Sequence, residues 1–258
     1  MELNEVKDLL VAAGDCLLEY WPRGKSSSPL KVMTKPDGSS VTEADLAADK
    51  MIREGLAKLF PNDGVLSEEI PVEKREVEKE RFWIIDPLDG TTSFINGKED
   101  FCILAARCAS GVAEFGVMYF PATGEYVWAE KGRGAYLWNE PISVSNRDVL
   151  TEGSVYVRCV KEVDFDKKHL FPNSQLNSGN AFFMLSRGAL DGICMKYSEF
   201  GAHDFAGPSV IVKEAGGMFT DEKGQEPLFL PGVNTMEYII ASNGAIHSEL
   251  LIHFNKLS

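Results

Sequence analysis

Apolar residues recur at helical spacing near the start of the chain and again after residue 42. The first set predicts an amphipathic helix that ends near Trp21-Pro22, and its apolar positions are Val6, Leu9, Leu10, Ala13, Leu17 and Leu18. The second set follows Thr42, a natural helix N-cap, and predicts a helix that stops at Pro61. Its apolar positions are Leu46, Ile52, Leu56 and Leu59. The chain therefore opens with two helices, separated by a Ser-rich loop and a short candidate strand at residues 30–34.

The middle of the chain carries the pattern of antiparallel β-structure. Two apolar runs, 101–109 and 112–120, are separated by a Ser-Gly pair and predict a hairpin. Residues 125–129 and 134–138 flank a charged turn and predict a second hairpin.

After a polar seam at residues 146–153, helices and strands alternate. The expected elements are a strand at 155–160, a short helix and loop within 161–176, a helix at 181–190, a strand at 193–195, a helix from Asp204 to Gly217, strands at 218–219 and 238–241, and a helix at 245–257. Together with the antiparallel middle, this order predicts a mixed α/β fold.

Composition narrows the class of function. The chain has 258 residues and a formal net charge of −13, which argues against nucleic-acid binding through a basic surface. Its five cysteines include no Cys-x-x-Cys pair, and no apolar run approaches transmembrane length. The acidic start, Met-Glu-Leu-Asn-Glu, does not resemble a signal peptide, which leads us to expect a cytoplasmic protein.

One run of bulky apolar residues, Phe82 to Ile85, is followed by residues that suit a metal ion and a phosphate. The run predicts a buried strand because it is short, uninterrupted and closed by turn residues. Two carboxylates, Asp86 and Asp89, come at its end, followed by Gly90 to Thr92. Mg²⁺ prefers carboxylate and carbonyl oxygens and shares the phosphate oxygens of a substrate. An Asp-Gly pair alone is an ordinary turn, but the whole string Asp-Pro-Leu-Asp-Gly-Thr behind a buried strand predicts a metal and phosphate site.

Three further segments carry polar residues with competing explanations. Asp45, at the third helical position behind Thr42, is fully explained by helix capping. Ser67-Glu68-Glu69 follows an apolar pair and is either another metal-facing strand end or a solvated turn. Ser178-Gly179-Asn180 opens a predicted helix, where small residues expose amides that can meet an anion. The pattern alone leaves these alternatives open.

Four motifs in this order are similar to a known family. They are Val41-Thr42-x-Ala-Asp45, Ser67-Glu68-Glu69, Trp83-x-x-Asp86-Pro-Leu-Asp89-Gly-Thr91 and Asp204-x-Ala-Gly-x5-Lys-Glu214-Ala-Gly-Gly217. They resemble the inositol monophosphatase superfamily, the lithium-sensitive, Mg²⁺-dependent phosphatases. The matching segments span residues 35–217, and the Asp-Pro-Leu-Asp-Gly-Thr and Glu-Ala-Gly-Gly strings together are highly specific.

The resemblance implies a ligand set and a catalytic pair. The implied metal ligands are Glu68, Asp86, Asp89, Asp204 and the backbone carbonyl of Leu88. Asp45 and Thr91 would orient the attacking water, and Glu68 would share in deprotonating it. The implied substrate contacts are Asp89, Gly90, Thr91, Ser178 and Asp204. Two or three Mg²⁺ ions would neutralise the phosphate dianion, lower the pKa of the water and stabilise the leaving alkoxide.

The resemblance also implies an architecture and partners. It predicts a layered αβαβα fold in one domain, residues 1–258, with an α+β lobe at about 1–150, an α/β lobe at about 151–258 and the metals between them. The expected partner is a small phosphate ester, with no nucleic acid polymer and no membrane. The protein would be a monomer or a homodimer.

Within the family, residues 34–42 and 66–69 look most like the 3′(2′),5′-bisphosphate nucleotidase branch. That branch converts adenosine 3′,5′-bisphosphate to AMP and phosphate. Three positions depart from it: Thr92 and Ala181 stand where it places Lys, and His203 stands where it places Trp.

Other members of the family remain as alternatives. Inositol-1-monophosphatase fits Thr92, but the acid that contacts inositol hydroxyls has only Glu199 as a nearby candidate. A fructose-1,6-bisphosphatase-like activity is a further alternative. A non-catalytic phosphate-ligand-binding regulator is the competing class, and the complete metal set argues against it.

Overall fold

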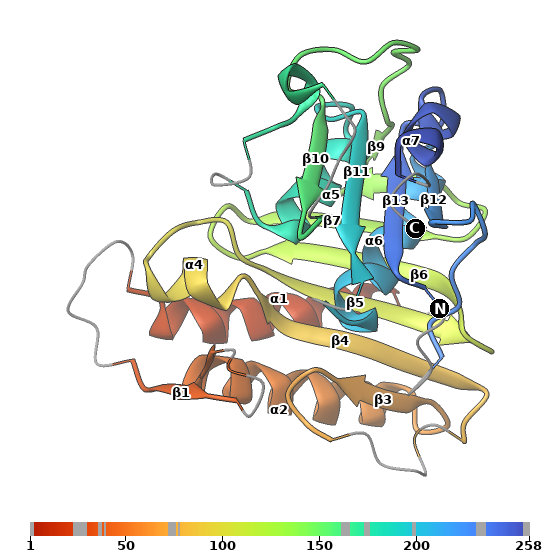
Figure 1. Ribbon diagram of the computed structural model, residues 1–258. Coiled ribbons are helices and arrows are strands. Elements are labelled where there is room, and N and C mark those ends of the chain that lie inside the picture. The colour runs from red at the N-terminus through yellow and green to blue at the C-terminus, as the bar shows by residue number, and fades with distance from the viewer. Residues whose placement is uncertain are drawn as a thin grey trace.

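The protein forms five layers of helices and sheets in a computed structural model (Figure 1). The structure describes residues 3–22, 30–35, 38, 40–71, 76, 78–160, 166–172, 176–197, 200–230 and 236–254. Two N-terminal helices cover one face of a seven-stranded sheet, and two later helices fill the space between its other face and a four-stranded sheet. A last helix packs on the outer face of the smaller sheet. The predicted α/β, αβαβα fold class is thereby confirmed.

The two N-terminal helices are α1 (Leu3–Tyr20) and α2 (Glu43–Leu59), as the hydrophobic periodicity predicts. The stripe of α1 formed by Val6, Leu10, Ala13 and Leu17 is fully buried against α2 and the large sheet. A hairpin of β1 (Val32–Thr34) and β2 (Ser40–Thr42) lies between the two helices in sequence. It leads directly into α2, so Thr42 both ends β2 and caps the helix.

The large sheet has the order β3-β4-β5-β6-β7-β8-β9. Its strands are β3 (Gly64–Ser67), β4 (Arg81–Asp89), β5 (Cys102–Ala109), β6 (Val112–Phe120), β7 (Glu125–Glu130), β8 (Ala135–Leu137) and β9 (Glu140–Ile142). Both predicted hairpins are confirmed, and β3, which the sequence left unassigned, pairs in parallel with β4. β4 continues past the predicted strand to Asp89 because its pairing with β5 resumes after a shift of register. The parallel pair brings the carboxyl ends of β3 and β4 to the same edge.

The small sheet has the order β10-β11-β13-β12, and it is mixed. Its strands are β10 (Val155–Arg158), β11 (Gly192–Lys196), β12 (Met218–Asp221) and β13 (Tyr238–Ser242). α5 (Ser178–Ser186) and α6 (Ala202–Glu214) lie between the two sheets, and α7 (His247–Phe254) covers the outer face. Two short helices, α4 (Thr91–Ile95) and η1 (Lys167–His169), connect the longer elements.

Some predicted boundaries were wrong, and others fall outside the described residues. The predicted helix at 181–190 starts earlier and ends at Ser186, because the chain turns through Gly188, which has a φ of 75°. The strand predicted to reach residue 160 ends at Arg158. Part of the segment 161–176 and the last residues of the C-terminal helix lie outside the described residues.

Helix α6 approaches the large sheet unusually closely. A Cβ on Gly116 of β6 would lie 2.3 Å from the carbonyl oxygen of Gly207, and a Cβ on Gly207 would lie 2.9 Å from that of Ala105. Glycine at both positions therefore allows the helix backbone to rest on the strands. This contact fixes the start of α6 beside the end of β4. No described helix has the length and hydropathy that a membrane crossing requires.

Candidate active site

Two carboxylates stand at the end of β4, as the sequence predicts. Asp86 and Asp89 are both buried and flank the register shift in the strand. The Asp86 carboxylate accepts a hydrogen bond from the amide of Leu88 at 2.9 Å. Asp89 accepts bonds from the hydroxyl of Ser178 and the amide of Gly179, both at 3.0 Å. The start of α5 thus meets an anion, as expected, and that anion is the protein's own Asp89.

Glycine is required where α5 meets Asp89. A Cβ on Gly179 would lie 2.6 Å from Oδ2 of Asp89 and 2.4 Å from the sulfur of Cys102. Any larger residue would push the carboxylate away from the helix amide. The position therefore links a small residue in α5 to the orientation of an acid on β4.

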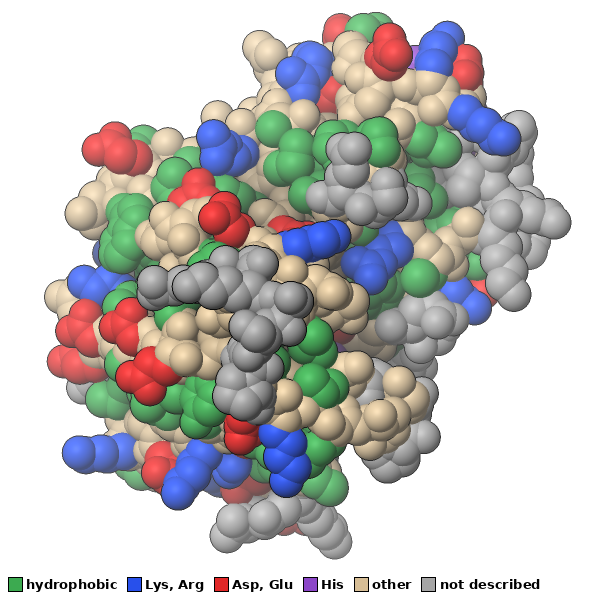
Figure 2. Space-filling model, turned by 90° about the vertical axis from the view of Figure 1, so that its left-hand side faces the viewer, with side chains coloured by type: hydrophobic (Ala, Val, Ile, Leu, Met, Phe, Trp, Pro, Cys, Tyr) green, Lys and Arg blue, Asp and Glu red, His purple; other side chains and the backbone are tan. Residues whose placement is uncertain are grey.

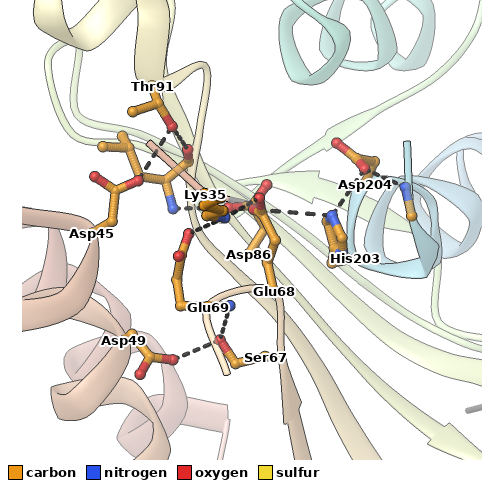
Figure 3. A network of polar contacts seen from close by, with 12 residues as sticks. Lys35, Asp45, Asp49, Ser67, Glu68, Glu69, Asp86, Thr91, His203 and Asp204 are labelled. Carbon is orange, nitrogen blue, oxygen red and sulfur yellow. Dashed lines mark hydrogen bonds and ion pairs between the residues drawn. The ribbon is translucent and has the colours of Figure 1, made fainter. Parts of the chain in front are cut away.

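Asp204 and Glu68 complete the acidic cluster from two other elements (Figure 3). Asp204 is buried at the third position of α6 and accepts a bond from the amide of Gly201 at 2.7 Å. Glu68 follows β3, and its amide bonds to the carbonyl of Ile85 at 3.1 Å. Glu68 lies in the partly exposed turn that follows β3, and its carboxylate faces Asp86 and His203.

The cluster is suited to divalent cations. One carboxylate oxygen from each of Asp86, Asp89 and Asp204 lies within 4.8 Å of the others, and so do donor atoms of Glu68, Asp86 and His203. Hard cations take such oxygen ligands from several segments. The side chains of four of the five implied ligands, Glu68, Asp86, Asp89 and Asp204, therefore lie in one cluster. The fifth, the carbonyl of Leu88, accepts the Thr91 hydroxyl at 3.1 Å.

Burial and mutual repulsion disfavour the negative charge of these acids. Burial, followed by the charges of Glu68, Asp89 and Asp204, raises the pKa of Asp86. Burial and the charge of Asp204 raise the pKa of Asp89 to about 6, although Gly179 and Ser178 donate hydrogen bonds to it. Like charges in a low-dielectric site shift pKa values in this direction, and a bound cation removes the cause.

The Asp45 carboxylate has hydrogen-bond partners both at the start of its own helix and across the site. Its Oδ2 accepts bonds from the Thr42 amide at 2.9 Å and the Thr42 hydroxyl at 2.5 Å, which completes a capping box. Its Oδ1 lies 3.2 Å from the Thr91 hydroxyl. Burial raises the pKa of Asp45, against the effect of these hydrogen bonds. The capping explanation is therefore correct but incomplete, because the same carboxylate also faces the loop that follows β4.

The loop after β4 turns at Gly90, which has a φ of 89°. A Cβ there would lie 2.6 Å from Nδ2 of Asn177 and 2.9 Å from the carbonyl oxygen of Asp100. Both the conformation and the space demand glycine. The turn places Thr91 at the first position of α4, beside Asp45.

Sequence reasoning missed the role of Lys35. Its ammonium lies 2.7 Å from Glu68 and 2.9 Å from Glu69. Burial lowers the pKa of Lys35, but the hydrogen bonds and charges of the two glutamates outweigh it and the pKa rises. Burial raises the pKa of Glu69 to about 7 in spite of Lys35. In the sequence, Lys35 directly precedes Pro-Asp-Gly and the segment that resembles the family, and this position was the only signal for Lys35.

A cleft of about 340 Å³ opens beside these acids. The described residues that line it are Gly38, Ser40, Glu68, Asp89, Gly90, Thr91, Thr92, Ser93, Arg158, Asn177, Ser178 and Phe200. Arg158 and Phe200 were not anticipated, and the guanidinium lies 5.3 Å from the centre of the Phe200 ring. On the face that carries α4 and β1, Figure 2 shows acidic and basic side chains interspersed, without a broad basic surface among the described residues.

The residues that distinguish the candidate substrates have different locations. Thr92 is exposed and lines the cleft, whereas Ala181 is fully buried in the core between the sheets and cannot meet a ligand in the cleft. Nε2 of His203 lies 3.2 Å from Asp204. Glu199 lies outside the described residues.

Curated relatives match nearly the whole chain. A histidinol-phosphatase of Chlorobaculum parvum is 32% identical and covers 97% of this chain and 95% of its own. A fructose-1,6-bisphosphatase/inositol-1-monophosphatase of Thermotoga maritima is 33% identical, with coverage of 96% and 94%. A 3′(2′),5′-bisphosphate nucleotidase of Aggregatibacter actinomycetemcomitans is 28% identical, with coverage of 85% and 84%. These names agree on a phosphatase and differ on the substrate.

Solved structures and family models point the same way. An inositol monophosphatase from Thermotoga maritima superposes with a TM-score of 0.80 at 31% identity, and the match covers 97% of this chain and 95% of that one. The model of the inositol monophosphatase family matches residues 3–257. The family resemblance of the motifs is thus confirmed over the full fold, and the chain belongs to the inositol monophosphatase family.

Proposed function

We propose that this family phosphatase hydrolyses a phosphate monoester that carries a second anionic group, with a 3′(2′),5′-bisphosphate nucleotide as the first candidate. The observation that carries the proposal is Arg158, whose guanidinium lines the same cleft as Asp89, Gly90 and Thr91. Guanidinium is suited to bidentate recognition of phosphate. Phe200, beside Arg158 in the cleft, offers an aromatic surface of the kind on which a base stacks.

In this proposal some of the acids bind metal ions and others activate the water. Glu68, Asp86, Asp89, Asp204 and the carbonyl of Leu88 hold Mg²⁺, which when bound neutralises the phosphate and lowers the pKa of water. Asp45 accepts the Thr91 hydroxyl bond and so holds that oxygen in position to orient the attacking water. Glu68 takes up a proton from this water, while Lys35 keeps the Glu68 carboxylate aimed into the site.

Substrate contacts come from the loop after β4 and from α5. The amides of Gly90 and Thr91 bind phosphate oxygens, since glycine permits a close backbone approach. Asp89 and Asp204 would act on the substrate by holding the ions, and Ser178 lies beside Asp89 at the cleft wall. No protein nucleophile takes part, so the products are the free alcohol and inorganic phosphate.

A second candidate is histidinol phosphate, which the name of the Chlorobaculum parvum relative favours. That ester carries an amine in place of a second anion, so Arg158 would repel it. Fructose 1,6-bisphosphate and inositol 1-phosphate remain further alternatives. Esters with a second anionic group and histidinol phosphate, which carries an amine, differ in the charge that they present to Arg158.

The test combines a substrate series with one substitution. Mg²⁺-dependent phosphate release is measured for adenosine 3′,5′-bisphosphate, fructose 1,6-bisphosphate, inositol 1-phosphate and histidinol phosphate, in the wild type and in Arg158→Gln. We expect the nucleotide to have the highest kcat/KM. Arg158→Gln should raise its KM about tenfold or more, because a hydrogen bond to a charged group contributes about 1.5–3 kcal/mol. The KM for inositol 1-phosphate should stay the same.

Arg187→Gln is the matched control. Arg187 also lies over a phenylalanine ring, that of Phe183, at 5.0 Å, but it is not among the residues that line the cleft. It should leave every KM unchanged. A preference for histidinol phosphate that Arg158→Gln does not weaken would contradict the proposal. Ligand binding without turnover of any ester would instead indicate a regulator.

A further inference from the structure

His203 directs its imidazole at the acidic cluster. Its Nε2 lies 3.2 Å from Oδ2 of Asp204 and 3.9 Å from Oε2 of Glu68 (Figure 3). The ring rests against Gly201, where a Cβ would lie 2.3 Å from the ring carbon Cε1. Glycine at position 201 thus makes room for the ring at the start of α6. The imidazole is therefore a built part of the cluster.

The two oxygens of Glu68 face different partners. Oε1 accepts the Lys35 ammonium at 2.7 Å, and Oε2 is the oxygen nearest to His203. Oxygens of the Glu68 and Asp86 carboxylates lie within 4.8 Å of each other. Glu68, Asp86 and His203 therefore face one another, while Lys35 is paired with the other oxygen of Glu68.

The cluster contains two sets of donor atoms that share Asp86. Glu68, Asp86 and His203 form one set, and Asp86, Asp89 and Asp204 form the other, each with its atoms within 4.8 Å of one another. Donors of one octahedral ion at about 2.1 Å lie about 3 Å apart when adjacent and about 4.2 Å when opposite. Each set can close around an ion of its own. The first set contains a nitrogen, whereas the second contains oxygen alone.

We propose that Nε2 of His203 is a nitrogen ligand of the ion that Glu68 and Asp86 hold, and that this position prefers Mn²⁺ or Co²⁺ to Mg²⁺. Mg²⁺ favours oxygen donors and near-ideal octahedra. Imidazole binds the later divalent metals more strongly, and affinity rises from Mn²⁺ to Co²⁺ and beyond. The all-oxygen position keeps its preference for Mg²⁺. The cluster is thus a mixed site with two different ligand fields.

A competing interpretation gives His203 the opposite effect. A protonated imidazole would act as a fixed counter-ion to Asp204 and Glu68 and would repel an incoming metal ion. The same distances suit that interpretation, but the two differ in the effect of removing the imidazole. As a ligand, His203 strengthens metal binding; as a counter-ion, it weakens binding.

Pulsed electron paramagnetic resonance on the Mn²⁺-loaded protein tests the ligand directly. We expect ¹⁴N modulation from coordinated imidazole in the wild type and its loss in His203→Gln and His203→Trp. His253→Gln, a change on α7, is the matched control and should keep the modulation. Circular dichroism confirms that each variant is folded. Wild-type Mn²⁺ spectra without ¹⁴N modulation would overturn the proposal.

Calorimetric titration separates the metals. His203→Gln should raise the Kd for Mn²⁺ about tenfold or more, because even changes beside a ligand cost 10–100-fold in metal affinity. The Kd for Mg²⁺ should change less than about threefold, because that ion is held by oxygen. Equal losses for both ions, or tighter binding, would contradict the proposal. The outcome does not depend on which ester the enzyme hydrolyses.

Discussion

Asp89 and Glu68 both neighbour Asp86, but the protein holds these two acids by different means. Neutral donors fix Asp89: the Ser178 hydroxyl and the Gly179 amide at the start of α5. A cation fixes Glu68, since the Lys35 ammonium lies 2.7 Å from it. Asp89 is therefore oriented while its full negative charge remains, whereas the negative charge of Glu68 is partly neutralised by Lys35.

The difference shows where a metal ion is most needed. Hydrogen-bond donors leave the repulsion between Asp89 and Asp204 in place, so the pKa of Asp89 still rises to about 6. On the other side, Lys35 serves both Glu68 and Glu69, and Glu69 still has its pKa raised to about 7, mainly by burial. A metal ion that binds Asp89 would not have to displace a cationic side chain. A metal ion that binds Glu68 would share that carboxylate with the Lys35 ammonium.

The largest effect should come from Asp89 itself. Asp89→Asn keeps the acceptor for Ser178 but removes the charge that attracts the ion. We expect kcat/KM to fall at least about 10³-fold, which corresponds to about 4 kcal/mol. Phosphate release at saturating Mg²⁺ measures the loss. Asp166→Asn, an exposed cap of η1, is the control and should be fully active. If Asp89→Asn kept a tenth of the activity, the metal assignment would be wrong.

Thr91 should have the next largest effect. Thr91→Val preserves the shape of the side chain but removes the hydroxyl that lies 3.2 Å from Asp45. We expect kcat to fall about 10²-fold, the lower range for a positioned proton-transfer group, with little change in KM. Thr91→Ser restores the hydroxyl and should recover most of the rate. Equal rates for the valine and serine variants would argue against a role for the hydroxyl.

The smallest expected effect is the pH dependence of the free energy of unfolding of the metal-free protein. The pKa of Asp89 is raised from 3.8 to about 6, so the folded state binds its proton more tightly than the unfolded state does. The stabilisation is complete below pH 3.8 and is lost as the pH rises through about 6. In the presence of a chelator, we expect a loss of about 2 kcal/mol across this window.

Urea unfolding at pH 4 to 7.5 measures this loss of stability. Subtracting the profile of Asp89→Asn isolates the contribution of Asp89 from that of other acids. Excess Mg²⁺ should restore stability above pH 6, because ion binding favours the folded state. Parallel profiles for the wild type and Asp89→Asn would show that Asp89 carries no such penalty.

Local sequence signals predicted the elements that carry the site. Periodicity located α1 and α2, and the capping signal correctly placed Asp45 in the first turn of α2. The apolar run before Asp86 located β4, although its continuation to Asp89 depends on pairing with β5. β3 was too short to assign because its stability comes from pairing with β4 and not from its own four residues.

The assembly of the site was predictable only through the family motifs. Nothing local joins Glu68, Asp204 and Asp45 to β4. The neighbourhood arises from the parallel pairing of β3 with β4, and from the glycine contact that sets α6 on the sheet. Arg158 and Phe200 escaped prediction because they come from β10 and from the segment before α6 and meet only in the folded cleft.

By itself, the sequence determined which segments form most of the helices and strands, which acids end the buried strand and which family the chain joins. These features depend on periodicity, caps and short motifs, whose physical causes act over a few residues. The tertiary structure alone decided that Asp89 is held by amides and Glu68 by Lys35, and that His203 faces both Glu68 and Asp204. Such relations depend on distances between elements far apart in the chain, because charge, burial and ligand geometry act through space.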